Sequence, residues 1–195
     1  REPDNAETLN EHAAASGGGL TVHTLDVADG ASVERLAREL KNEPLDILIN
    51  NAGIIGTRSG RPDYALWEEV FRVNSIGPFR MAEAFHDNLK KSATRKIVTI
   101  TSGMGSTANN GGGYYPYRSS KAAVNNIMRG LAADWGHDGF TIVVIHPGWV
   151  QTDMGGRGAS LTPRDSVAAM RKIFARLRPS DNGKFFDYRG SEIAW

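Results

Sequence analysis

The segment that decides the fold is residues 96–145, KIVTITSGMGSTANNGGGYYPYRSSKAAVNNIMRGLAADWGHDGFTIVVI. Lys96–Ile100 and Phe140–Ile145 are β-rich runs, and a helix is predicted between them from Pro116, which suits a first helical turn, to about Trp135. A loop rich in Gly, Ser and Asn, residues 101–113, precedes that helix. Apolar strands alternating with amphipathic helices are typical of a parallel sheet covered on both faces.

The same alternation continues on both sides of this segment. Strands are also predicted at Leu20–Leu25, Leu45–Ile49 and Lys184–Tyr188, and helices are predicted from a Ser32 cap to Leu40, from about Asp63 to Leu89, and from Thr162-Pro163 to Leu177. We see no internal repeat and no linker. The sequence therefore predicts one α/β domain over residues 1–195, a doubly wound parallel sheet in three α/β/α layers.

Composition excludes several classes of protein. Lys and Arg number 23 against 22 Asp and Glu, and the two signs are mixed along the chain, which argues against a nucleic-acid surface. The chain has no cysteine, so disulfides and thiolate chemistry are excluded. We see no apolar run long enough to span a membrane and no signal peptide, and the five histidines lack metal-ligand spacing. We expect a cytoplasmic protein that binds no metal, membrane or nucleic acid.

The strongest chemical signal is the pair Tyr117 and Lys121. Four positions apart on a helix, the two side chains share a face, and an ammonium beside a phenol is expected to lower the pKa of the phenol. Such a tyrosine can give or take a proton near neutrality. Ser102, just past a strand, is placed to hold a substrate oxygen. The alternative is that a Tyr and a Lys at this spacing lie on a surface without function.

Two other tyrosines test this interpretation. Tyr114 has Arg118 four positions on, but Pro116 is expected to hold Tyr115 extended and so to leave Tyr114 outside the helix. An arginine is always charged and cannot relay protons. Tyr115 is paired only with a serine, so Tyr117 is the tyrosine with a useful partner.

A proline inside the long predicted helix gives a second, independent indication. Pro78 has no N–H, so the carbonyl of Asn74, four residues earlier, loses its helical partner. We expect a bend there and a carbonyl that points away from its own helix. A kink that only shapes the helix is the alternative.

Six motifs in the right order resemble those of the short-chain dehydrogenase/reductase family. They cover the chain from Leu20 on, and they are Asp26-Val27, Asn50-Asn51-Ala52-Gly53, Val73-Asn74, Ile100-Thr101-Ser102 with Gly105, Tyr117 to Lys121, and Pro147-Gly148 with Thr152. The run from His146 to Gly156 is similar to the carbonyl-reductase-like branch of that family. The resemblance implies a Rossmann-like fold and an NAD(P)(H)-dependent oxidoreductase acting on a carbonyl or alcohol.

The resemblance also implies roles for four catalytic residues. Tyr117 would give the proton to the carbonyl oxygen, Lys121 would lower the pKa of Tyr117 and hold the nicotinamide ribose, and Ser102 would orient the substrate oxygen. Asn74 would hold a relay water through its backbone carbonyl. Ser106 is a rival for Ser102, which we prefer because it is nearer the strand end.

Cofactor contacts are implied at the ends of the strands. Besides Tyr117 and Lys121, the implied set is Asp26 and Val27 at the adenine, Asn51, Ala52 and Gly53 along the adenosine half, and Pro147, Gly148, Val150 and Thr152 around the nicotinamide. The cofactor supplies the hydride, and the protein supplies position and electrostatics.

The sequence departs from the family at its start. The family's first strand, its Gly-rich phosphate-binding turn, the helix and the second strand are not visible, and Gly17-Gly18-Gly19 opens no helix. We therefore expect a gap in the sheet between Leu20 and Leu45, an exposed apolar edge, and about 35 residues of a βαβ unit missing before Arg1. Arg1 is expected to be the remnant of a basic residue that favours NADP(H) over NAD(H).

Other interpretations remain open at this stage. A cofactor-binding signalling or regulatory protein and an inactive truncated chain are the alternatives to an enzyme. His146 is interpreted as structural rather than as a base, and the glycine-rich loop 151–160 as a lid or a disordered loop. Trp149 either touches substrate or covers the loop, and the apolar faces of the long helices allow a homodimer. The particular carbonyl or alcohol substrate is not encoded.

Overall fold

A four-stranded parallel sheet forms the centre of the computed structural model, which describes residues 2–195. The strands lie side by side in chain order: β1 (Ile47–Asn50), β2 (Lys96–Ile100), β3 (Thr141–His146) and β4 (Phe185–Asp187). Val98 at the centre of β2 pairs with Ile49 and Val143. The predicted parallel sheet is confirmed, and β1 forms one of its edges.

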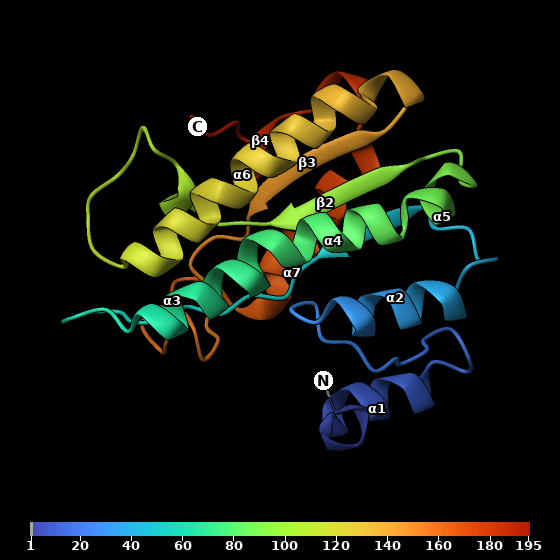
Figure 1. Cartoon of the computed structure of the whole chain (residues 1–195), viewed down its shortest axis with the longest axis horizontal. Coiled ribbons are helices and arrows are strands. Elements are labelled where there is room, and N and C mark those ends of the chain that lie inside the picture. The colour runs from blue at the N-terminus through green and yellow to red at the C-terminus, as the bar shows by residue number, and fades with distance from the viewer. Residues whose placement is uncertain (1) are drawn as a thin grey trace.

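Helices cover both faces of the sheet (Figure 1). Their bounds are α1 (Glu7–Ala15), α2 (Gly30–Glu39), α3 (Tyr64–Phe71), α4 (Gly77–Ala84), α5 (His86–Lys90), α6 (Tyr115–Trp135) and α7 (Pro163–Arg176). Residues of α4, α5 and α6 pack on one face, around Val124, Ile142 and Phe185. The other face holds α7, with Ile173 against Val98 and Val143. The three-layer, doubly wound arrangement follows from this packing.

Beyond the β1 edge, α2 packs against α4 through a small cluster that includes Val33, Leu36, Met81 and Phe85. Asp29, not Ser32 as predicted, caps α2 by accepting from the Ala31 N–H at 3.1 Å. Ser32 is buried, and its hydroxyl accepts from the Asp26 N–H instead.

The strand predicted at Leu20–Leu25 is wrong: this run has no regular secondary structure. Leu25 and the following Val27 pack against the α2–α4 cluster, while Leu20 is exposed. A β-rich sequence becomes a strand only when another backbone pairs with it, and β1 pairs only with β2 within residues 2–195. Ile49 on β1 is 43% exposed, so the expected apolar edge is present. The expected gap is not, because without a strand at Leu20–Leu25 the sheet ends at β1.

The first 19 residues contain a helix that the sequence did not predict. The exposed helix α1 buries no residue and is followed by Gly17 and Gly18, both at positive φ. Since glycine adopts that conformation without a steric penalty, these glycines end a helix rather than begin one.

The long predicted helix from Asp63 to Leu89 is divided in three. A π-helical turn, Arg72–Ile76, separates α3 from α4, and Phe85 separates α4 from α5. Within the π turn the Gly77 N–H donates to the Arg72 carbonyl, five residues earlier. Pro78 follows directly and has no N–H to donate to the Asn74 carbonyl. The helix is therefore irregular at Asn74, as the sequence predicted.

Helix α6 begins one residue before the prediction. Tyr114 is its N-cap in the left-handed conformation, outside the helix as predicted. The prediction that Tyr115 is extended is wrong, because Tyr115 is the first residue of the helix. The chain changes direction one residue earlier, at Tyr114, whose carbonyl accepts the first helical hydrogen bond from the Arg118 N–H at 2.9 Å.

Candidate active site

The candidate site lies at the carboxyl ends of β1, β2 and β3, where ligands bind in open α/β sheets. Ser102 follows β2 by two residues, and Tyr117 and Lys121 come from the N-terminal half of α6. All three side chains are buried, between 4% and 8% exposed. Residues from the loop after β2 and from α6 therefore meet in a desolvated setting.

Tyr117 points into the protein, and a hydrogen bond links its side chain to that of Ser102. Burial raises the pKa of Tyr117 above 10.0, while the Ser102 bond acts in the opposite direction. The expectation that Lys121 lowers the pKa of Tyr117 below its ordinary value is therefore wrong for the protein alone, because desolvation of the phenolate outweighs its stabilisation. Tyr117 is a neutral phenol at neutral pH.

Lys121 donates from Nζ to the Ile100 carbonyl at 2.8 Å, and Nζ lies 5.7 Å from the centroid of the Tyr117 ring. Burial lowers the pKa of Lys121 to about 8, since an ammonium loses solvation there. Below that pH the group is an ammonium held close to the tyrosine by the end of β2.

Ser102 is fixed as the N-cap of a short 3-10 turn, Gly103–Gly105, and its Oγ accepts from the Met104 N–H at 3.1 Å. Its rival Ser106 is buried and donates to the Ala194 carbonyl at 2.6 Å. Ser102, and not Ser106, is thus the serine that reaches Tyr117.

Asn74 lies in the π turn and is fully buried. Its amide clamps the chain that follows β1: Oδ1 accepts from the Ile54 N–H at 2.9 Å, and Nδ2 donates to the Ile54 carbonyl at 2.8 Å. Nδ2 also donates to Ser120 Oγ at 3.0 Å. The side chain therefore sets the position of the loop after β1 relative to α6.

That loop contains a narrow cradle at Gly53. A Cβ atom at this position would lie 3.4 Å from Asn74 Oδ1 and 3.6 Å from Lys121 Nζ. Asn51 and Ala52, the two preceding residues, are exposed beside it. A backbone without a side chain, flanked by an amide and a buried ammonium, fits the close approach of a polar cofactor such as a nicotinamide nucleotide.

Asp26 and Val27 lie beside the first turn of α4, which directly follows the π turn. The Asp26 carboxylate accepts from the Ala28 N–H at 2.9 Å, and Arg80 donates to the Val27 carbonyl at 3.0 Å. Gly77 is needed here, because a Cβ on it would lie 3.1 Å from Val27 Cγ2. This pair is held at the β1 edge, separate from the Tyr117 cluster.

The remaining sequence-predicted residues line the turn after β3. Gly148 has φ of +85°, and a Cβ there would lie 2.3 Å from Leu161 Cδ1. Val150 pairs with Leu161, and the Pro147 carbonyl accepts from Ser166 at 2.6 Å. Thr152 is exposed, and its Oγ1 accepts from the Gly155 N–H at 3.2 Å. The contacts of Thr152 thus stay within its own loop.

The glycine-rich loop beyond Trp149 is internally bonded rather than irregular. The Trp149 ring is 57% exposed, and its Nε1 donates to the Gly155 carbonyl at 2.9 Å. Arg58, from the loop after β1, donates to the Met154 carbonyl at 3.1 Å. The loops after β1 and β3 are therefore joined to each other.

His146 ends β3 and packs against Gly103, whose Cβ position lies 3.4 Å from His146 Cδ2. Its Nδ1 is buried and has no hydrogen-bond partner within the described chain. Burial lowers the pKa of His146, and the nearby Asp187 carboxylate opposes this only in part. A neutral, enclosed histidine agrees with the structural interpretation.

Sequence reasoning missed Ser120 and Asn125, two buried polar residues on the same helix as Tyr117. Ser120 Oγ accepts from Asn74 and donates to the Tyr117 carbonyl at 2.8 Å. Asn125 lies four residues after Lys121, on the same face of the helix, and this spacing was a usable signal.

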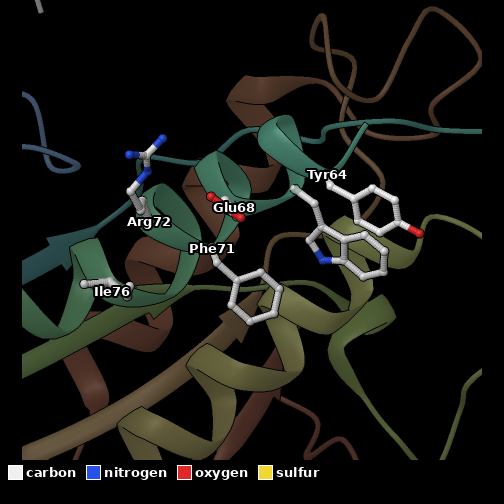
Figure 2. A pocket seen from close by; sticks show the side chains of 6 residues that line it. Tyr64, Glu68, Phe71, Arg72 and Ile76 are labelled. Carbon is white, nitrogen blue, oxygen red and sulfur yellow. The ribbon is translucent and has the colours of Figure 1, made fainter. Parts of the chain in front are cut away.

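A groove of about 430 Å³ lies elsewhere, on the outer side of α3 (Figure 2). It is lined by Tyr64, Trp67, Glu68, Phe71, Arg72 and Ile76, so it contains none of the predicted site residues. In the part of the chain that the structure describes, no cluster of His, Asp and Glu is placed to hold a metal ion. No helix described there is long and apolar enough to cross a membrane.

The fold and site define a class: a Rossmann-like α/β protein with a buried tyrosine, lysine and serine at the carboxyl end of its sheet. The family described as short chain dehydrogenase matches residues 1–160. The C-signal protein of Myxococcus xanthus is 46% identical over 155 residues, which are 78% of this chain and 93% of that protein.

Two solved structures are closely similar to the whole chain. The carbonyl reductase Sniffer of D. melanogaster has a TM-score of 0.94 and 29% identity, and the alignment covers 100% of this chain and 86% of Sniffer. The NADPH-bound carbonyl reductase from chicken fatty liver has a TM-score of 0.91 and 32% identity, with 100% and 85% covered. The chain belongs to the short-chain dehydrogenase family and is one of its NAD(P)-dependent oxidoreductases.

Proposed function

We propose that the protein interconverts a carbonyl and an alcohol with Tyr117 as proton donor and acceptor. The observation that carries this proposal is the buried meeting of Tyr117, Ser102 and Lys121. Two similar structures are those of carbonyl reductases, which supports a reaction at a carbonyl group. Residues 1–195 would form one nicotinamide-binding domain, from which the sequence leads us to expect that part of the N-terminal βαβ unit is missing.

The raised pKa of Tyr117 suits reduction, because a neutral phenol has a proton to give to the carbonyl oxygen. Ser102 would orient that oxygen through its hydroxyl. Lys121, as an ammonium, would stabilise the phenolate that remains. The nicotinamide, when bound, supplies or accepts the hydride. In the reverse direction the phenolate takes the alcohol proton.

The residues around the cradle would hold the cofactor. Asn51, Ala52 and Gly53, with Asp26 and Val27, would bind the adenosine half, and Pro147, Gly148, Val150 and Thr152 would line the nicotinamide. Tyr117 and Lys121 would contact its ribose. The Gly53 cradle and the backbone turn at Gly148 support this assignment. The backbone carbonyl of Asn74 would hold a relay water, since Pro78 cannot give it the N–H that a regular helix supplies four residues on.

NADP(H) is our proposed cofactor in preference to NAD(H). Two similar structures hold this cofactor: the carbonyl reductase from chicken fatty liver, and a short-chain dehydrogenase/reductase from Burkholderia multivorans. Arg1, the basis of the expectation from sequence, lies outside the described residues. Nucleotide fluorescence titrations of the full chain compare the two directly. Equal or tighter binding of NADH would contradict the preference.

Tyr117→Phe tests the catalytic assignment. Loss of the phenol proton should lower turnover on a panel of quinones and aldehydes by about 10²–10⁴-fold. The melting temperature should stay near that of the parent, and the affinity for NADPH should fall by no more than about tenfold, since only one contact to the ribose is lost. Tyr115→Phe, two residues earlier and 61% exposed, is the matched control. Unchanged turnover in Tyr117→Phe would refute the proposal, and cofactor binding without any turnover would favour the signalling alternative instead.

A homodimer through the outer faces of α3 and α6 is also proposed. Tyr64 is 66% exposed and Tyr115 is 61% exposed, and Tyr64 stacks on Trp67, which lines the same groove on α3 (Figure 2). Light scattering should give twice the mass of the chain, and Tyr64→Arg should give a monomer. A monomer for the parent at every concentration would contradict this. The cytoplasmic location stays a prediction.

A further inference from the structure

Asn125 lies behind the candidate site and is only 2% exposed. Its position on α6 is one turn after Lys121 and two turns after Tyr117, on the face that meets the end of β2. The Asn125 amide uses both of its ends: Oδ1 accepts from Thr101 Oγ1 at 2.7 Å, and Nδ2 donates to the Gly105 carbonyl at 3.2 Å. Thr101 directly precedes Ser102, and Gly105 is the last residue of the 3-10 turn that Ser102 caps.

Gly105 also lies directly on α6. A Cβ at this position would be 2.9 Å from the Lys121 carbonyl carbon and 3.0 Å from its oxygen, so only glycine allows the turn to lie this close. The Lys121 ammonium bonds to Ile100, the residue before Thr101. The segment 100–105 is therefore bonded to α6 on both sides of Ser102: at Ile100 and Thr101 before it, and at Gly105 after it.

We infer that Asn125 and Thr101 are positioning residues that set the place of Ser102 relative to Tyr117. This inference rests on the proposed function. The two residues do not touch the reacting atoms; they fix the distance between a loop and a helix that each carry one catalytic group. A displacement of about 1 Å in such an arrangement can cost about 100-fold in rate.

A purely structural role for the amide makes different predictions. If Asn125 only satisfied buried polar groups, its loss would lower the free energy of unfolding and would reduce turnover by the same factor whether or not Ser102 is present. If Asn125 acts through Ser102, its loss should have little effect once the serine hydroxyl is gone.

The test is a double-mutant cycle in the full chain. Thr101→Val and Asn125→Ala are made with Ser102 intact and with Ser102→Ala, and kcat is measured per folded molecule with NADPH and the quinone and aldehyde panel. With Ser102 intact we expect kcat to fall about 10–100-fold. In the Ser102→Ala background we expect less than about a twofold further change. Thr101→Ser, which keeps the hydroxyl, should restore the rate.

A second measurement does not depend on turnover. The ¹³Cζ resonance of Tyr117, observed in tyrosine-labelled protein without cofactor, reports the hydrogen bond from Ser102. Thr101→Val and Asn125→Ala should move this resonance toward its position in Ser102→Ala, and should move it no further when combined with that change. If neither the parent nor any variant reduces a carbonyl, the proposed function is wrong. The resonance of Tyr117 then still tests whether Asn125 and Thr101 position Ser102.

Asn88→Ala is the control. Asn88 is 3% exposed and also makes two amide bonds, to the carbonyls of Leu40 and Glu43, at the amino end of the sheet. It should lose stability and keep both kcat and the Tyr117 resonance. If Asn125→Ala fails to fold, the near-isosteric variant Thr101→Val tests the inference through the same two measurements. Equal rate losses in both Ser102 backgrounds, or an unmoved resonance, would overturn the inference.

Discussion

Replacing Lys121 by methionine removes a buried ammonium and keeps a side chain of similar length. The pKa of Lys121 is lowered from 10.5 to about 8 by burial, so the folded protein binds this proton less tightly than the unfolded chain does. The difference between the two pKa values corresponds to about 3 kcal/mol of destabilisation at neutral pH. Methionine does not carry this cost.

The sign and the pH range follow from linkage. Below about pH 8 the lysine is charged in both states, and the full cost of burying the charge is present. As the pH rises from about 8 to 10.5, the folded protein loses the proton first, and the cost disappears. Methionine also loses the bond to the Ile100 carbonyl, which costs about 1–3 kcal/mol at every pH.

Urea unfolding followed by tryptophan fluorescence measures both variants between pH 7 and 10. At pH 7 we expect Lys121→Met to be as stable as the parent or up to about 2 kcal/mol more stable, although its turnover is lost. Between pH 7 and 10 the parent should gain about 2–3 kcal/mol relative to the variant. Lys41→Met changes an exposed site and keeps Lys121, so its stability should follow the pH profile of the parent. A parent–variant difference that is constant over this range would refute the reasoning.

Three further predictions concern the cofactor loops and the proton donor's surroundings. Gly148→Ala should lower the free energy of unfolding by about 2–4 kcal/mol, since its Cβ meets Leu161 and its φ is positive; Gly156→Ala, at φ of +75° in open space, should cost only about 1–2 kcal/mol. Equal losses in urea titrations would disprove the steric part. Asn74→Ala removes three hydrogen bonds of a buried amide, so calorimetry should find weaker NADPH binding; unaltered affinity would count against the role of Asn74 in positioning the loop after β1. For carbonyl reduction, kcat/KM should be constant near neutral pH and should fall above about pH 8 as Lys121 loses its proton. A rise in kcat/KM above about pH 8 would contradict the proposal that Lys121 acts as an ammonium.

Local sequence patterns were sufficient for much of the fold and for the centre of the site. Apolar runs and helical spacing predicted the four strands of the sheet and α6, because these elements follow from which side chains can be buried. Helical geometry placed Tyr117 and Lys121 on one face, and both are buried there. The missing N–H of Pro78 predicted the irregular turn at Asn74.

Other features depended on partners that are distant in sequence. Leu20–Leu25 has the composition of a strand but pairs with nothing in the described chain, and strand pairing is a property of two segments. Asn125 had the right spacing, but its value lies in its bonds to Thr101 and Gly105, which only the packing of α6 on the β2 end creates.

The sequence by itself determined the groups to which we assign the chemistry: a tyrosine and a lysine one helical turn apart, and a serine just beyond a strand. The tertiary structure alone decided their electrostatics. Spacing suggested that Lys121 would lower the pKa of Tyr117, whereas burial raises it and also lowers the pKa of Lys121. The reason is physical: spacing fixes the distance between two charges, but the free energy of charging each one depends on how much water the rest of the fold removes.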